Sequence, residues 1–240
     1  MLNILLHLAD DALILGHRNS EWTGHGPILE QDIALSNIAL DLIGQSRNFY
    51  QLATTLKNNG CTEDHLAFLR DAPQFLNSLL VEQENGHWGK TVLRQFFFSV
   101  YASWLYRQLQ EHEHRELAAI AAKSLKEIAY HLRWSSEWVI RLGKGTAESN
   151  VKMQDALNEL WPYTAELYTP AEYEKDMINF QALEQNWKEQ VHEVLSRANL
   201  QIPQLVEMQS GGKNGNHSPL LALLLAEMQY MQRTYPGMEW

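Results

Sequence analysis

The chain of 240 residues has 19 Lys and Arg against 29 Asp and Glu, a formal net charge of −10, and 45% hydrophobic residues. The hydrophobic content excludes a disordered chain. The acidic excess argues against nonspecific binding to nucleic acid or anionic membranes, because both depend on Lys and Arg. The single cysteine, Cys61, excludes an internal disulfide and any CxxC motif. We therefore expect a cytoplasmic protein whose partners are proteins or neutral ligands.

The apolar N-terminal segment, residues 2–15, is interrupted by Asp10 and Asp11 and lacks both a basic flank and a small-residue cleavage site. It is typical of a helix rather than of a signal peptide. No later segment has the roughly 20 uncharged apolar residues that span a bilayer, so we expect no membrane segment.

The next element is a long helix between Pro27, where a first-turn proline belongs, and Gly60, where a C-terminal glycine belongs. Its apolar residues recur every seven positions: Ile28, Leu35, Leu42, Phe49 and Leu56. This spacing predicts one face of a bundle helix.

A second long helix is predicted over 88–111, after two short helical stretches. Its middle, residues 96–106, is apolar or aromatic on every side, which indicates burial either within its own domain or against a partner. The remaining predicted helices are, in chain order, 116–142, 146–162, 180–198 and 219–233. No stretch alternates with period two, and no repeat or linker interrupts the pattern. We expect an all-α helical bundle with additional helices, forming a single domain over 1–240.

Polar residues on the long helices raise the question of a metal site. A di-iron carboxylate bundle needs one carboxylate from each of two helices and a Glu-x-x-His pair from each of the other two. The ligand-like positions of this chain are degenerate: Asp41, Gln95, Phe98, Glu127, Tyr130, Asp155 and Asn158. His131 lies one position too far from Glu127 for the usual pair. The sequence therefore predicts no metal-binding, cofactor-binding or catalytic residue in this chain.

Three interpretations of these polar residues stay open. The first is a buried hydrogen-bonded or ionic cluster, with Lys123 or Arg94 balancing the acids, since an unpaired buried charge costs about 3–5 kcal/mol. The second is a general acid/base pair of Glu127 and His131. The third is an unusual two-metal ligand set: Asp41, Glu127, His131 and Asp155. We favour the first, because the sequence shows neither a nucleophile nor a substrate pocket.

The Gly-rich loop at 211–215 lacks the GxxxxGK[ST] spacing of a phosphate-binding loop, and no strand is predicted before it. We interpret it as a surface turn whose Lys213 is available to an anionic ligand from a neighbouring chain.

Several longer segments carry a resemblance to a known family. In chain order they are Glu21-Trp22-x-Gly24-His25-x-Pro27, NIALDLIGQSRNFYQLA (37–53), LLVEQENG (79–86), AAIAAKSLKEIAYHLRWSSEWVIRLGKGT (118–146), KMQDALNELW (152–161), GGKNGNHS (211–218) and LLAEMQYMQRTYPGMEW (224–240). Together they span nearly the whole chain, which resembles the PaaC family of phenylacetate-degradation proteins.

The resemblance implies a ferritin-like fold and a noncatalytic structural subunit of the phenylacetyl-CoA 1,2-epoxidase complex, which is oxygen- and NADPH-dependent. In such a complex the related PaaA subunit carries the di-iron centre, and PaaB and the PaaE reductase, with its FAD and iron–sulfur cluster, complete the assembly. Two alternatives are a di-metal oxidoreductase in its own right and a free-standing acyl-CoA-binding protein. A homodimer of the chain alone also stays open, as does a contact between Lys213 and a CoA phosphate.

The same resemblance leads to a hypothesis about the surface that holds PaaA. The aromatic helix at 96–106 has more apolar surface than a bundle helix usually needs, and the helix at 27–59 is the longest predicted. We expect both helices to contribute to the interface with PaaA.

Overall fold

The computed structural model describes residues 1–58 and 60–238, and these residues form helices joined by short 3-10 turns and loops, without strands. The helices are α1 (Leu2–Ser20), α2 (Leu29–Lys57), α3 (Glu63–Phe68), α4 (Leu79–Glu82), α5 (Trp88–Leu109), α6 (Arg115–Gly143), α7 (Ala147–Leu160), α8 (Phe180–Arg197), α9 (Pro219–Met228) and α10 (Tyr230–Thr234). The prediction of an all-α protein is confirmed. No helix within the described residues is long and apolar enough to cross a membrane.

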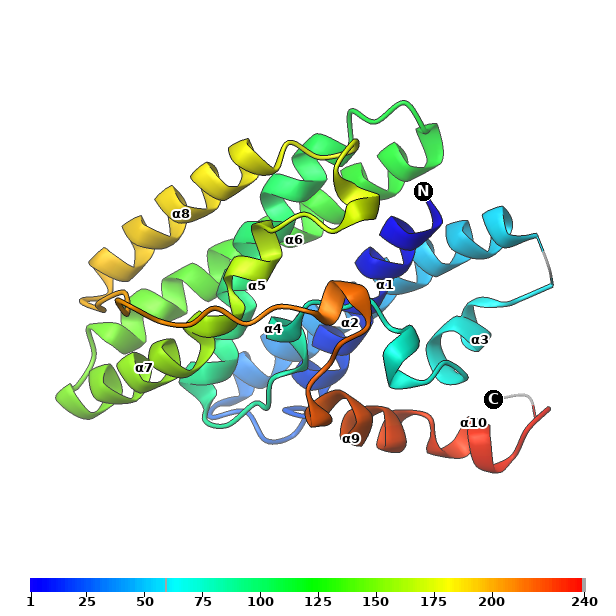
Figure 1. Ribbon diagram of the computed structural model, residues 1–240. Helices are drawn as coiled ribbons and strands as arrows, with labels where there is room; N and C mark the ends of the chain where they lie inside the picture. The colour runs from blue at the N-terminus through cyan, green and yellow to red at the C-terminus, as the bar shows by residue number, and fades with distance from the viewer. Residues whose placement is uncertain (59, 239–240) are drawn as a thin grey trace.

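Four long helices form the ferritin-like bundle. α1 packs along α2, α5 packs along α6, and α2 meets α6, so the two helix pairs enclose a common core. α7 and α8 pack on α5 and α6 and lie on the side of the bundle opposite to α3 and α10 (Figure 1). The four bundle helices are thus α1, α2, α5 and α6, whereas α7, which carries the ligand-like Asp155 and Asn158, packs on the outside of α5 and α6. The apolar segment at 2–15 was predicted to be a helix, but its sequence did not indicate that this helix is long enough to be one of the four bundle helices.

The aromatic run of α5 is buried within the chain itself. Phe96, Phe97, Val100 and Leu105 are completely or almost completely inaccessible, and Trp104 alone in the run is partly exposed. α6, α7 and α8 cover this helix on the sides that the bundle leaves open. The hypothesis that residues 96–106 form an intersubunit surface is therefore wrong.

Helix ends agree with the predictions to within a few residues, and each difference has a local cause. α2 begins after Pro27 with an extended Ile28, and Asn58 in the left-handed region, rather than Gly60, ends it. The Thr146 side chain caps α7 by accepting a hydrogen bond from the Ser149 N–H. The predicted helix at 219–233 is divided between α9 and α10 at Gln229, whose amide donates to the carbonyls of Ala67 and Arg70.

Candidate functional site

Two hydrogen-bonded pairs join α2 to α6 where polar residues were predicted inside the bundle. His131 Nε2 lies 2.9 Å from Asp41 Oδ2, and Gln45 Nε2 donates to Glu127 Oε2 over 2.9 Å. His131 and Gln45 are buried, whereas the Asp41 side chain is 38% exposed and Glu127 is half-buried. Tyr106 on α5 adds a long hydrogen bond of 3.4 Å to Gln45 Oε1. The site is therefore a polar seam that reaches the surface at Asp41.

The spacing along the two helices explains this arrangement. Asp41 and Gln45 are four residues apart on α2, as are Glu127 and His131 on α6, so each pair shares a helix face. The two helices run antiparallel, which sets Asp41 opposite His131 and Gln45 opposite Glu127. Each acid thus has a partner from the facing helix. This outcome agrees with the favoured interpretation of a hydrogen-bonded cluster, although with other partners than predicted.

Neither of the cations proposed to balance these acids does so. Lys123 is exposed on α6, and Arg94 binds the carbonyl of Gln83 and the Asn85 side chain, at 2.5 Å from Asn85 Oδ1. Burial lowers the pKa of the Arg94 guanidinium to about 9, and the nearby charge of Arg18 acts in the same direction. The imidazole and the amide, not a Lys or Arg, are therefore the partners of Asp41 and Glu127.

The other ligand-like residues of α5 and α6 are not directed at a common point. Gln95 accepts a 2.7 Å hydrogen bond from Asn19 on α1 and donates to Ser99 on its own helix. Phe98 is part of the hydrophobic core. Tyr130 lies 38% exposed at the surface, beneath the Arg133 guanidinium.

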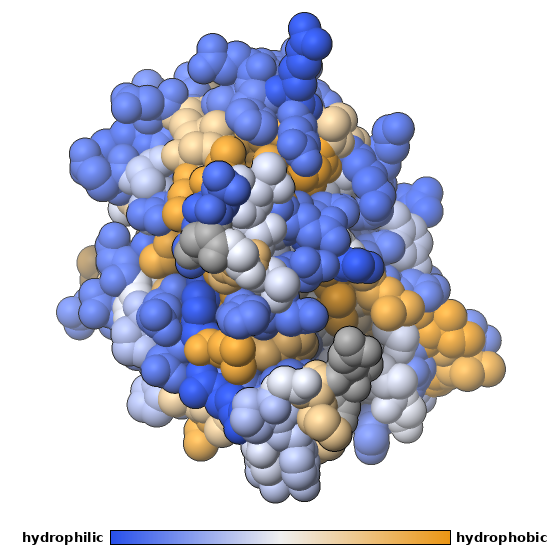
Figure 2. All heavy atoms as spheres, turned by 90° about the vertical axis from the view of Figure 1, so that its right-hand side faces the viewer, coloured by the Kyte–Doolittle hydropathy of each residue, from blue (hydrophilic) through white to orange (hydrophobic). Residues whose placement is uncertain are grey.

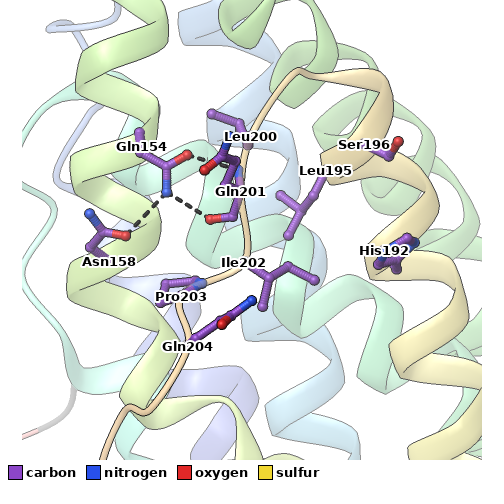
Figure 3. Close-up of a pocket in the computed structure, with 10 residues that line it drawn as sticks. All are labelled: Gln154, Asn158, His192, Leu195, Ser196, Leu200, Gln201, Ile202, Pro203 and Gln204. Atoms are coloured by element: carbon purple, nitrogen blue, oxygen red, sulfur yellow. Dashed lines mark hydrogen bonds between the residues drawn. The ribbon is translucent and has the colours of Figure 1, made fainter.

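Asp155 and Asn158 lie outside the bundle interior, exposed on α7. Asn158 lines a surface cavity of about 710 Å³ between α7, α8 and the segment 200–204. Gln154 projects there between Asn158 and Gln201 and donates to both of their oxygens (Figure 3). The cavity is lined by amide, hydroxyl and apolar side chains and by His192. This lining supplies no carboxylate for metal binding.

These positions do not fit a di-iron centre. Among the ligand-like positions, Gln95 and Asn158 carry amides, Tyr130 carries a phenol and Phe98 a phenyl ring, and the His131 imidazole directs Nε2 at Asp41. His131 Nδ1 is buried and has no hydrogen-bond partner within the described part of the chain, so the second shell that normally orients a metal-bound histidine is missing there. Across residues 1–58 and 60–238, no group of three or more His, Cys, Asp or Glu side chains is placed to hold a metal ion.

A second cluster of charges, which the sequence did not predict, surrounds α1. Asp10 is fully buried and binds the Arg70 guanidinium, and it accepts hydrogen bonds from the Tyr50 hydroxyl at 2.5 Å and the Leu76 N–H at 2.8 Å. Burial alone lowers the pKa of Arg70, but the Asp10 carboxylate outweighs this effect and raises it. Asp10 thus ties α1 to α2 and to the segment 70–76.

The neighbouring acid, Asp11, points to the next loop. Its carboxylate accepts hydrogen bonds from the Ser78 N–H at 2.7 Å and the Ser78 hydroxyl at 2.9 Å. Burial raises the pKa of Asp11, and the nearby His7 and the Ser78 hydrogen bonds oppose this shift. His7, one turn earlier, binds the Leu76 carbonyl and the Tyr101 hydroxyl. One face of α1 therefore makes internal polar contacts through His7, Asp10 and Asp11, although Asp11 Oδ2 accepts no hydrogen bond among the described residues.

The Gly-rich loop completes this cluster. Lys213 is 2% exposed, and its ammonium lies 3.1 Å from the buried Glu174 carboxylate. Glu166 accepts hydrogen bonds from the backbone N–H groups of Gly211, Lys213 and Leu79. The interpretation of Lys213 as free is wrong, because Glu174 binds its ammonium in the interior and Glu166 holds the loop backbone; Asn214 is the residue of the turn that remains exposed.

Two glycines make the burial of this loop possible. A Cβ on Gly212 would lie 2.3 Å from the Asn77 carbonyl oxygen, and one on Gly215 would lie 2.4 Å from the Pro73 carbonyl oxygen. Gly215 also has φ +80°, in the left-handed region that glycine favours. Close backbone packing, rather than the binding of phosphate, explains the glycines of the GGKNG segment.

His217 leads to a prediction about pH. Its Nδ1 lies 2.9 Å from Glu82 Oε2 and its Nε2 lies 2.9 Å from the Phe75 carbonyl, so both nitrogens face acceptors. Burial alone lowers the pKa of His217, but the hydrogen bonds to Glu82 and Phe75 outweigh it and raise the pKa. The charged ring therefore stabilises the fold fully below its unfolded pKa of about 6.5, and this contribution is lost as pH rises through the higher folded pKa.

We expect His217→Gln to reduce the free energy of unfolding most at about pH 6 and progressively less above it. Urea unfolding of both proteins over a pH series measures the difference between their free energies of unfolding. Other titrating groups, such as Asp11, are present in both proteins, so their contributions cancel in this difference. A difference that grew with increasing pH would contradict the assignment of a charged His217.

Two comparisons with known proteins point to one family. The family model for phenylacetic acid catabolic protein, PaaA_PaaC, matches residues 1–240. The chain is 45% identical over 241 aligned residues to an Escherichia coli (strain K12) protein named as a subunit, designated C, of 1,2-phenylacetyl-CoA epoxidase, with 98% of this chain and 97% of that protein covered. The chain therefore belongs to the PaaA_PaaC family of phenylacetic acid catabolic proteins.

Proposed function

We propose that this chain is the noncatalytic structural subunit of a phenylacetyl-CoA 1,2-epoxidase and supports a related di-iron subunit, PaaA. The observation that carries the proposal is the α2–α6 site, where the ligand-like acids Asp41 and Glu127 are hydrogen-bonded to His131 and Gln45 of the facing helix. Such pairs stabilise the bundle without a metal. The 45% identity to a protein named as a subunit of this epoxidase supports the same role.

The physical task of such a subunit is to keep its partner's helices in place. A metal site depends on a rigid surrounding shell, because small displacements of the ligands change coordination and reactivity. We further propose that PaaB and the PaaE reductase, with its FAD and iron–sulfur cluster, belong to the same complex and that it works in the cytoplasm. In this assembly the oxygen chemistry takes place on PaaA.

Glu127→Gln tests the proposed division of labour. The substitution keeps the size of the side chain, and its carbonyl oxygen still accepts from Gln45, so the bundle keeps its geometry. We expect the complex to retain its iron content and to keep epoxidation of phenylacetyl-CoA within about twofold of the wild-type rate. Metal analysis and turnover with NADPH and the reductase measure both quantities.

The matched control is the same Glu→Gln change at an iron ligand of the di-iron subunit, which should abolish turnover. Stoichiometric iron in the isolated chain that is lost in Glu127→Gln would instead support a di-metal oxidoreductase built on Asp41, Glu127 and His131.

A further inference from the structure

Three surface cavities adjoin one another along α8, outside the four-helix bundle. The cavity of about 710 Å³ shares His192 and Ser196 with a second one of about 770 Å³. The second shares Trp161 and Lys188 with a third one of about 560 Å³. The three therefore form one groove between α8 and the segment 200–208, which we call the α8 groove.

The segment 202–208 forms one wall of the α8 groove, and hydrogen bonds hold it only at its two ends. Before it, the backbone of Gln201 exchanges two hydrogen bonds of 2.8 Å with the Gln154 amide. After it, the Gln209 N–H donates to the Pro162 carbonyl over 2.8 Å. Between these ties, no hydrogen bond or ion pair joins 202–208 to any other residue that the structure describes. Segments with exposed, unpaired backbone groups open locally at a low cost in free energy, so this wall can move outward to admit a ligand.

Uncharged polar groups without internal partners line one end of the α8 groove. The side chains of His192 and Ser196 are exposed, lie four residues apart on α8, and make no hydrogen bond within the described part of the chain. The same holds for the Gln204 amide, and Asn158 accepts one hydrogen bond from Gln154 but leaves its own NH2 group unpaired. In Figure 3 these side chains border the cavity from α7, from α8 and from the loop that follows α8. Together they offer donors and acceptors, which suits a ligand head group that has both, such as an amide.

The middle of the groove is apolar. Trp161 and Ile202 pack against the hydrophobic core and line the groove with their remaining surface. The centroid of the Trp161 ring lies 6.0 Å from that of Phe97 and 6.1 Å from that of Trp187, so these rings fix the indole from the inside. A flat aromatic group can pack on such an indole in the offset or edge-to-face arrangements that aromatic pairs prefer.

The charges of the groove argue against an anionic ligand. Lys188 lies 2.5 Å from Glu184, and Arg197 lies 3.3 Å from Glu193. Glu189 adds a third carboxylate to the lining. Both Lys and Arg side chains are thus paired already, and acids outnumber them. A carboxylate or phosphate group would lose hydration here without gaining a cation of its own, whereas a neutral ligand avoids this cost.

The opposite side of the molecule, which carries α3 and α10, does not separate polar from apolar groups in this way. It has a cavity of about 920 Å³, but the lining mixes Asp64 and His65 with apolar side chains. Over this whole face, hydrophobic groups are interrupted by polar ones (Figure 2). The α8 groove is therefore the better candidate for a ligand with one apolar and one polar end.

We propose that the α8 groove is a binding site for a neutral aromatic compound with an amide-like head group. The aromatic ring packs beside Trp161 and Ile202, and the head group forms hydrogen bonds with His192 and Ser196. The site lies on α7 and α8, away from the polar residues that join α2 to α6, so it does not depend on the proposed structural role.

Phenylacetamide and phenylacetate are a matched pair of probes, because they share the ring and the methylene group and differ in an amide against a carboxylate. We expect the full chain, without any other subunit, to bind phenylacetamide with a Kd of about 1 mM or below. Phenylacetate should bind at least about 10-fold more weakly, since its charge finds no free cation. Titration of the ¹⁵N-labelled indole N–H resonances measures both affinities, with the signal of Trp161 assigned from Trp161→Phe.

Two substitutions on α8 locate the site. Ser196→Phe fills the groove, and Gln185→Phe places the same side chain at an exposed position of α8 outside the groove lining. Circular dichroism checks that both variants fold. We expect Ser196→Phe to weaken the binding of phenylacetamide at least about 10-fold and Gln185→Phe to bind it like the wild type. The proposal is overturned if the wild type shows no saturable binding, if phenylacetate binds as tightly as phenylacetamide, or if the two variants bind equally.

Discussion

Lys213→Met should lower the free energy of unfolding by about 3–5 kcal/mol, because it leaves the Glu174 carboxylate buried without its cation. Lys213 Nζ lies 3.1 and 3.3 Å from the two Glu174 oxygens and 3.2 Å from the Thr169 carbonyl. Methionine fills a similar volume but supplies no charge and no donor. For a chain of this size the loss corresponds to a decrease in Tm of roughly 6–20 °C.

Lys188→Met is a closely matched control. Lys188 also binds a carboxylate, that of Glu184 at 2.5 Å, and also lies over a tyrosine ring, but its side chain is 56% exposed. Exposed ion pairs contribute at most about 1 kcal/mol, so this variant should unfold nearly like the wild type. Urea unfolding measures both. Equal effects of the two substitutions would contradict the burial of an essential ion pair, and Glu174→Gln should recover part of the loss caused by Lys213→Met.

Lys213 also shows what the sequence could not predict. Its partner Glu174 is 39 residues away, with the whole of α8 between them in the sequence, and nothing local to GGKNG distinguishes a buried loop from a surface turn. α1 did provide a signal, since two adjacent acids in an otherwise apolar segment need partners if the helix is buried. In the sequence, Asp10 and Asp11 were used only as evidence against a signal peptide, although they lie on a face of α1 that makes many internal hydrogen bonds.

The parts that were predicted correctly depend on local spacing. The four-residue interval that brings Glu127 and His131 to one face of α6 comes directly from helical geometry, and the structure sets this face against α2. For α5, an apolar surface on every side predicted burial but could not identify what covers it. The covering helices α7 and α8 lie where only the tertiary fold places them. The hydrophobic pattern therefore predicted where the helices lie. Whether α5 is buried in its own core or at an interface depended on the tertiary packing.

The second large effect is expected at the Asp10–Arg70 pair. A single substitution leaves one buried charge without its partner, whereas the double substitution removes both charges. Asp10→Leu leaves the Arg70 guanidinium, the Tyr50 hydroxyl and the Leu76 N–H without their common acceptor. Arg70→Met leaves Asp10 with the two neutral donors. We expect each variant to lose about 3–5 kcal/mol, with Asp10→Leu the less stable of the two.

The double variant should be more stable than the sum of the two losses predicts, by about 1–3 kcal/mol, since neither charge is then left unpaired. Urea unfolding of the four proteins measures this coupling energy. The exposed pair Arg197 and Glu193 provides the control cycle, with an expected coupling of about 0.5 kcal/mol or less. Additive losses at Asp10 and Arg70 would show that the two side chains act independently.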